Sequence, residues 1–419
     1  MTSSKQSAGR RLGFATVDQA MSGASNLLIA VLAARLLGVE SFGLFGITML
    51  VYIVVLGGSR ALVGEPLLLH PVEAEQRPGD AIGSACLLGV GLGLLVIVGG
   101  LGARLWEPRL GDALIVLGVF LPLMVLQDMG RYLGFATRRP QSALTLDVAW
   151  LVLQIGAIGA LIATNNDTLP TYIGAWAGSG AAAGLLVFWQ HRAASVKLTF
   201  SWLIETWRYS WRYLISYTST QGSGLLAAIL LGAIAGARAL GGVQGALLLQ
   251  RPFTTFQTAV IASGVGEISR DAADRSRVRQ MVIKLTTLTT GVALLNGVVL
   301  LALPDRLGRV VLGDTWGVAQ HLLWPAAAQI LLIGLMTGFR TGLLGMRAIH
   351  KAVVIDVIVT VLSVAFSTTG AILGGAGPAM WGVVASQSIG LLMWAAVFWS
   401  YSETDGGLSD TASVSPPAA

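Results

Sequence analysis

Long apolar runs recur along the whole chain, and the short connectors between them carry most of its charge. As a helix, an apolar run of about 20 residues crosses the hydrocarbon core of a bilayer. Only 11% of the 419 residues are charged, whereas a soluble protein has about a quarter. Such a chain cannot cover a water-facing surface, and it is predicted to be an all-α integral membrane protein of about twelve transmembrane helices.

The predicted spans divide the chain into two sets of six. They lie at approximately 13–34, 42–63, 81–103, 113–135, 142–163, 170–190, 211–235, 240–263, 282–303, 318–341, 350–374 and 378–400. We therefore expect a cytoplasmic tail at 1–12, a six-helix bundle at 13–195, an interfacial linker at 196–210, a second bundle at 211–401 and a disordered tail at 402–419. Aromatic and basic residues interleave in the linker, a pattern typical of a helix lying at the headgroups.

The basic residues set the orientation. With the N-terminus inside, only six Lys or Arg fall in outside connectors: Arg35, Arg104, Arg109, Arg238, Arg306 and Arg309. Most of the others fall in inside segments, as the positive-inside rule requires. Arginine outnumbers lysine by 23 to 4, which is typical of a high-GC bacterial genome. The sequence thus predicts a multi-pass protein of the bacterial inner membrane with both termini in the cytoplasm.

The second half repeats elements of the first about 200 residues later. The turn near Gly38 and the Gly64-Glu65 pair correspond to Gly232–Gly242 and Gly266-Glu267. Two six-helix halves in the same orientation are parallel repeats, and such transporters bind substrate between the halves.

The segment Ala34-Arg-Leu-Leu-Gly-Val-Glu-Ser-Phe-Gly-Leu-Phe45 resembles the first turn of bacterial polysaccharide transporters, the O-antigen flippases of the multidrug/oligosaccharidyl-lipid/polysaccharide (MOP) exporter superfamily. Val311–Gln320 with Leu344-Gly-Met-Arg347 resembles their second-half pattern. The resemblance implies two bundles in a MATE-like V and a central cavity. It also implies translocation of a polyprenyl-diphosphate-linked oligosaccharide. The partners that it implies are membrane lipids, a polysaccharide polymerase and glycosyltransferases, and it implies no binding of nucleic acid.

Ionisable residues inside spans are costly and are therefore functional candidates. Arg251 lies in the middle of span 240–263 beside Pro252, with Gln244 and Gln257 nearby. Arg60 lies towards the cytoplasmic end of its span. We predict that both arginines, with the two glutamines, bind the substrate headgroup, because a guanidinium fits a diphosphate well. Structural pairing of Arg251 and snorkelling of Arg60 to the surface are the alternatives.

The acidic residues of the spans suggest other roles. Asp18, in the first span, is a candidate for proton or sodium coupling, or a polar residue near the interface. Asp128 and Arg131 are three apart on one helix face and are predicted to form an ion pair. Structural pairing is also expected for Asp147 and Asp356.

The sequence carries no pattern for catalysis. Its four histidines show no metal-ligand spacing, and it contains neither GxSxG nor a Walker A motif. No catalytic residue, cofactor or metal is therefore predicted, and the chain is predicted not to be an enzyme. The sequence favours a flippase working by alternating access. The alternatives are an ion-coupled multidrug or small-molecule exporter of the same superfamily and, from another class, a membrane-embedded glycan polymerase or ligase.

Overall fold

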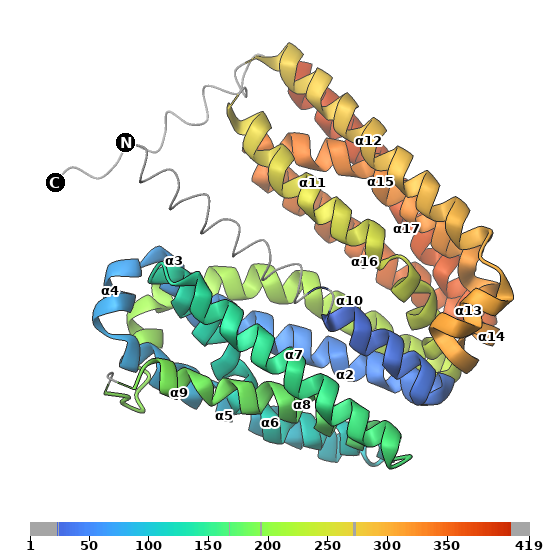
Figure 1. Ribbon diagram of the computed structural model, residues 1–419. Coiled ribbons are helices and arrows are strands. Elements are labelled where there is room, and N and C mark those ends of the chain that lie inside the picture. Colours follow the sequence, from blue (N-terminus) through green and yellow to red (C-terminus); the bar gives the residue numbers. More distant parts are fainter. Residues whose placement is uncertain (1–22, 24, 167, 193–194, 271–273, 404–419) are drawn as a thin grey trace. The chain divides into compact units, whose positions relative to one another are not determined.

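The computed structural model describes residues 23, 25–166, 168–192, 195–270 and 274–403. In these ranges every regular element is a helix (Figure 1), and ten helical stretches are long and apolar enough to cross a membrane. The prediction of an all-α membrane protein is confirmed. Of the twelve expected spans, 13–34 lies largely outside the described residues, where only the shorter apolar helix Ser25–Leu36 remains. The segment 240–263 is helical but interrupted.

The described chain forms two compact units, and the first comprises 1–248 and 306–319. Its helices are Ser25–Leu36, α2 (Gly38–Ser59), η1 (Arg60–Gly64), α3 (Glu65–Leu69), α4 (Pro71–Gln76), α5 (Pro78–Ala103), α6 (Pro108–Ala136), α7 (Pro140–Ala163), α8 (Leu169–Gly184), α9 (Leu186–Gln190), α10 (Ser201–Leu249), most of α13 (Asp305–Leu312), η2 (Gly313–Thr315) and α14 (Trp316–Ala319).

Helix α6 is the centre of the first unit, because α2, α5, α7 and α8 all pack against it. Its inward side chains, such as Leu117, Leu121 and Val125, are completely buried. Proline occupies the first helical position of α5, α6 and α7, where the missing N–H costs nothing. These three helices therefore begin where the sequence places their prolines.

The second unit comprises 249–305 and 320–419. Its described helices are α11 (Arg251–Arg270), α12 (Arg275–Leu301), η3 (Gln320–Leu322), α15 (Leu323–Gly345), α16 (Ile349–Gly374) and α17 (Ala376–Glu403). Helix α15 packs against α11, α12 and α17, and α16 packs along α17. Their side chains form one apolar core that includes Val282, Leu343 and Phe398.

The turn near Gly38 and its counterpart in the second half, within Gly232–Gly242, each contain a glycine with a positive φ. Gly38, which begins α2, has φ +70°, and Gly236, inside the stretch assigned to α10, has φ +85°. L-residues with a side chain rarely adopt this conformation, so glycine is required at both turns. The helical stretch in the second half is therefore kinked at Gly236, at the start of the connector expected at Ala237–Gly242.

The eighth predicted span is broken in its middle. Helix α10 ends at Leu249, and α11 begins at Arg251 with Pro252 in its first turn. Proline lacks an N–H and clashes with the preceding turn, so a helix cannot continue through it undisturbed. The break before Pro252 places Arg251 at the beginning of a helix.

Residues Ser195–Phe200, which we call the strap, form an extended segment before α10 and lie along the N-terminal turns of α5. A Cβ at Gly79 would collide with the Ser195 carbonyl oxygen, and one at Gly83 with that of Lys197. Ser84 Oγ donates a hydrogen bond to the Thr199 carbonyl oxygen over 2.7 Å. Small residues on one face of α5 thus form the groove that holds the strap.

An ion pair fixes the first turns of α10 beside the strap. Arg77 Nη2 lies 2.8 Å from Glu205 Oε2, and the hydrogen bond that it donates keeps the pKa of the Glu205 carboxyl below its ordinary value. A carboxyl whose pKa is lowered by folding contributes stability above its unfolded pKa, and this contribution disappears as the pH falls through the folded pKa. The pair is solvent-exposed, so its contribution is small.

Replacing Gly83 by valine is expected to displace the strap, because the Lys197 carbonyl oxygen occupies the space of the new side chain. Trypsin should then cleave after Lys197 several times faster than in the unchanged protein, which limited proteolysis in detergent measures. Gly91→Val is the matched control, since Gly91 lies on the same helix with nothing within 4 Å of its Cβ position. Equal cleavage rates in the two variants would show that the groove does not hold the strap.

Candidate functional site

Four charged side chains of the first unit form a continuous chain of ion pairs, which we call the charge cluster: Arg60, Asp128, Arg131 and Asp147. Arg60 Nε and Nη2 each donate to one oxygen of Asp128 over 2.7 Å. Arg131 Nη1 lies 3.3 Å from Asp128 Oδ1, and Arg131 Nε lies 3.1 Å from Asp147 Oδ1. Three of these side chains are almost completely buried; only Arg60 keeps 35% of its side chain exposed.

Local structure brings these side chains together. Asp128 and Arg131 are one turn apart on α6, so they share a helix face. Asp147 lies two turns into α7, the helix that follows α6 after a short turn, and Gln127 Nε2 donates to it over 3.0 Å. Arg60 begins η1, a π-helical turn in which the helix is locally wider. Such π-turns occur frequently at functional sites.

The cluster balances its charges within a low-dielectric environment. Two guanidinium groups alternate with two carboxylates, and each carboxylate has at least one arginine partner. Removing one partner from a buried pair costs about 3–5 kcal/mol because the other charge is left uncompensated. The ion pair that the sequence predicts between Asp128 and Arg131 is confirmed, and the expected pairing of Asp147 is confirmed with Arg131 as its partner.

One nitrogen of the Arg60 guanidinium, Nη1, keeps its hydrogen-bond donors unbonded within the described residues. Its Nε and Nη2 bind Asp128, whereas Nη1 donates to no group among the residues that the structure describes. The Tyr132 ring lies beside it, with its centroid 5.9 Å from Arg60 Cζ. The bidentate bond fixes the plane of the guanidinium and leaves the Nη1 edge available to a ligand.

Arg251 has a different environment in the second unit. Its side chain is exposed, and within the described ranges no carboxylate lies within ion-pair distance of it. Arg340, in the same unit, is by contrast paired with Asp356 at 3.1 Å, which confirms the pairing expected for Asp356. Arg251 is therefore a cation in the middle of a predicted span that the described protein does not neutralise.

The two glutamines of the predicted site are placed in different units. Gln257 Nε2 donates to Thr337 Oγ1 over 3.0 Å, from α11 to α15. Gln244, on α10, lies against α2, where a Cβ at Gly46 would be 2.7 Å from Gln244 Cγ. Asp18, the residue suggested for ion coupling, lies outside the described residues.

Arg60 and Arg251 do not occupy equivalent positions in the two halves. Counted from the positive-φ glycines, Arg60 follows Gly38 by about six helical turns and Arg251 follows Gly236 by about four. The two arginines thus differ by about two turns along the repeat. The role of one arginine therefore does not follow from that of the other.

The sequence did not indicate that Asp128 is the partner of Arg60. The two residues are 68 positions apart, and only the packing of η1 against α6 brings them together. The available signal was the presence of Asp128 and Arg131 within an otherwise apolar stretch, since membrane-buried charges almost always have partners.

Comparisons with solved structures identify the fold. An inward-facing multidrug resistance MATE family transporter of the MOP superfamily is similar with a TM-score of 0.71 and 15% identity, over 91% of this chain and 95% of that chain. Lipid II flippase MurJ in an inward closed conformation is similar with a TM-score of 0.70 and 11% identity, over 92% of this chain and 87% of that chain. A MOP superfamily transporter from Pyrococcus furiosus is similar with a TM-score of 0.55 and 14% identity, over 95% of this chain and 96% of that chain.

The chain therefore has an all-helical fold similar to that of these transporters, and it is a multi-pass integral membrane protein. The MATE transporter and MurJ are almost equally similar to it, so the fold favours neither an exporter nor a flippase. No family model matches the sequence. No curated protein matches it either.

Proposed function

We propose that this protein moves a polyprenyl-diphosphate-linked oligosaccharide from the cytoplasmic to the outer leaflet by alternating access. The observation that carries the proposal is Arg251, a mid-span cation with an exposed side chain and no carboxylate partner in the described chain. A charged side chain at this depth faces a water-filled cavity or a binding partner rather than lipid. An anionic diphosphate supplies the missing negative charge.

Arg60 supports the same function from the first unit. Asp128 holds its guanidinium in one orientation and leaves the Nη1 edge unbonded. A preorganised guanidinium loses little entropy on binding and donates to phosphate oxygens through charge-assisted bonds. We therefore propose that Arg60 binds a phosphate of the substrate from within the first unit.

The glutamines suit the uncharged part of the substrate. Gln257 uses its amide nitrogen for Thr337, and its amide oxygen accepts from no side chain in the described part of the chain. An amide oxygen accepts hydrogen bonds from sugar hydroxyls. We therefore assign Gln257, and Gln244 beside Gly46, to the glycan.

The exporter alternative needs a carboxylate that can bind a cationic drug or a coupling ion. In the described part of the first unit, Asp128 and Asp147 are each bonded to an arginine. Protonating either one would remove one of the two carboxylates that bind the buried Arg131, and protonating Asp128 would also leave Arg60 without its carboxylate partner, which is costly. This arrangement favours an anionic substrate over a cationic one.

The proposal is tested with the purified full-length chain in liposomes that contain radiolabelled polyprenyl-diphosphate-linked glycan isolated from the same cells. A membrane-impermeant glycosidase added outside should digest about half of the label without the protein and nearly all of it with the protein. If digestion stays at half while the same liposomes transport ethidium against a proton or sodium gradient, the exporter alternative is correct and the flippase proposal is wrong.

A further inference from the structure

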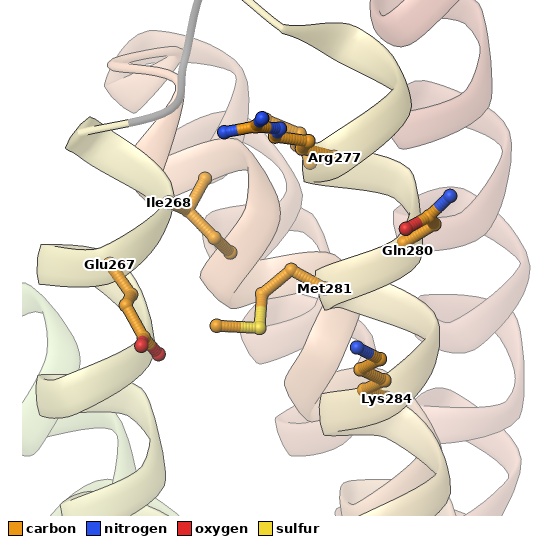
Figure 2. A pocket seen from close by; sticks show the side chains of 7 residues that line it. Glu267, Ile268, Arg277, Gln280, Met281 and Lys284 are labelled. Atoms are coloured by element: carbon orange, nitrogen blue, oxygen red, sulfur yellow. The ribbon is translucent and has the colours of Figure 1, made fainter.

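A cavity of about 290 Å³ lies between the end of α11 and the beginning of α12, inside the second unit. Figure 2 shows Glu267 and Ile268 on one helix and Arg277, Met281 and Lys284 on the other. Val278 and Gln280 complete the lining. Ligand pockets span about 300–1,000 Å³, so this cavity suits a small polar group and not a large glycan or drug.

Glu267 and Lys284, two of its three charged lining residues, mark the membrane boundary. No charged residue occurs in α11 between Arg251 and Glu267, and none occurs between Lys284 and Asp305 on the chain that contains α12. Glu267 therefore follows the apolar part of α11, and Lys284 precedes that of α12. The cavity lies where hydrocarbon gives way to headgroups, at the end that carries most of the basic residues.

Glu267 and Lys284 have no partner in the part of the chain that the structure describes. Neighbouring arginines have partners: Arg277 Nε lies 3.2 Å from Asp274 Oδ2, and Arg279 Nη2 donates to the Ser402 carbonyl oxygen over 2.9 Å. Among the described residues, by contrast, neither Glu267 nor Lys284 forms a hydrogen bond or an ion pair, with each other or with a third group. The cavity thus offers one negative and one positive group on separate helices.

The base of the cavity is apolar. Ile268 and Val278 are both 1% exposed and belong to the core of the second unit. The thioether of Met281 extends into the space between the two helices (Figure 2). Such a base accepts the methylene and glycerol groups of a ligand whose charged ends meet Glu267 and Lys284.

We propose that this cavity binds the headgroup of phosphatidylethanolamine, a zwitterionic phospholipid with a primary ammonium group. Lys284 binds the phosphate, Glu267 accepts hydrogen bonds from the ammonium group, and Met281 covers the glycerol. A primary ammonium has three N–H donors, whereas choline has none to offer the carboxylate. An anionic headgroup such as that of phosphatidylglycerol would bring no cation to Glu267.

Native mass spectrometry of the full-length chain tests this site, using nanodiscs with equal amounts of phosphatidylethanolamine and phosphatidylglycerol. The unchanged protein should retain the ethanolamine lipid preferentially. Lys284→Ala should lower retention of both lipids by about fivefold, because one phosphate contact near the surface contributes about 1 kcal/mol. Glu267→Gln should lower only the retention of the ethanolamine lipid and so reverse the preference.

Two variants control for a general change of charge. Lys197 and Glu75 are exposed and are not among the residues that line the cavity, so Lys197→Ala and Glu75→Gln should leave both retentions unchanged. Equal retention of the two lipids by the unchanged protein would overturn the proposal. The proposal would also fail if the Glu267→Gln variant still retained the ethanolamine lipid preferentially, since the carboxylate would then not bind the ammonium group. Neither outcome depends on which substrate the protein transports.

Discussion

Replacing Arg251 by alanine should lower the rate of lipid-linked glycan translocation by about a hundredfold while leaving the protein folded. A guanidinium makes two charge-assisted hydrogen bonds to a phosphate, each contributing about 1.5 kcal/mol, and their loss corresponds to roughly this factor. Because no carboxylate in the described chain pairs with Arg251, its removal leaves no buried charge behind. The glycosidase-protection assay in liposomes measures the rate.

The Arg251→Lys variant separates the contribution of the positive charge to transport from that of the forked geometry of the guanidinium. Lysine keeps the positive charge but cannot bind a diphosphate through two parallel bonds, so an intermediate rate is expected. Arg238→Ala serves as the matched control, because Arg238 is also exposed and lies on α10 in a predicted outside connector. If Arg251→Ala transports as fast as the Arg238 variant, Arg251 does not bind the headgroup.

Replacing Asp128 by alanine is expected to destabilise the protein by about 3–5 kcal/mol, because it leaves the buried Arg131 with Asp147 as its remaining carboxylate and Arg60 without its carboxylate partner. The variant should therefore unfold at a clearly lower temperature or denaturant concentration in detergent. Intrinsic tryptophan fluorescence follows the transition. Glu205→Gln is the control, since the Arg77–Glu205 pair is exposed and contributes at most about 1 kcal/mol.

A double variant tests whether the loss of stability arises from the ion pair between Arg60 and Asp128. In Asp128→Asn combined with Arg60→Gln both charges are absent, so the loss of stability should be smaller than that of Asp128→Asn alone. The same double variant should still transport slowly, because Arg60 is also assigned to the diphosphate. If the effects of the two single replacements on stability simply add, the bidentate bond does not couple the two residues.

The helices of this protein could be predicted because each depends on nearby residues. Apolar length predicts the spans, the prolines at 78, 108 and 140 mark the starts of α5, α6 and α7, and Pro252 marks the break before α11. The Asp128–Arg131 pair was predictable for the same reason, since one helical turn separates the two residues. In lipid the backbone must satisfy its own hydrogen bonds, which restricts such segments to helices.

The bond between Arg60 and Asp128 was not predictable, because it joins residues 68 positions apart on helices that meet only in the folded unit. The groove beneath the strap is a second example, since nothing in the sequence near Gly79 and Gly83 indicates that Ser195–Phe200 will lie there. The positions of Arg60 and Arg251 within the repeat are a third example, because only the positive-φ glycines show that the two arginines differ by about two helical turns.

The sequence by itself thus determined the class of protein, the helices and the residues whose charge is costly in a membrane. The tertiary structure decided which of those charges the protein neutralises: Arg60, Asp128, Arg131 and Asp147 compensate one another, while Arg251 has no carboxylate partner in the described chain. The physical reason is that hydrophobic burial acts along each segment, whereas an ion pair forms only when packing brings two side chains within about 4 Å.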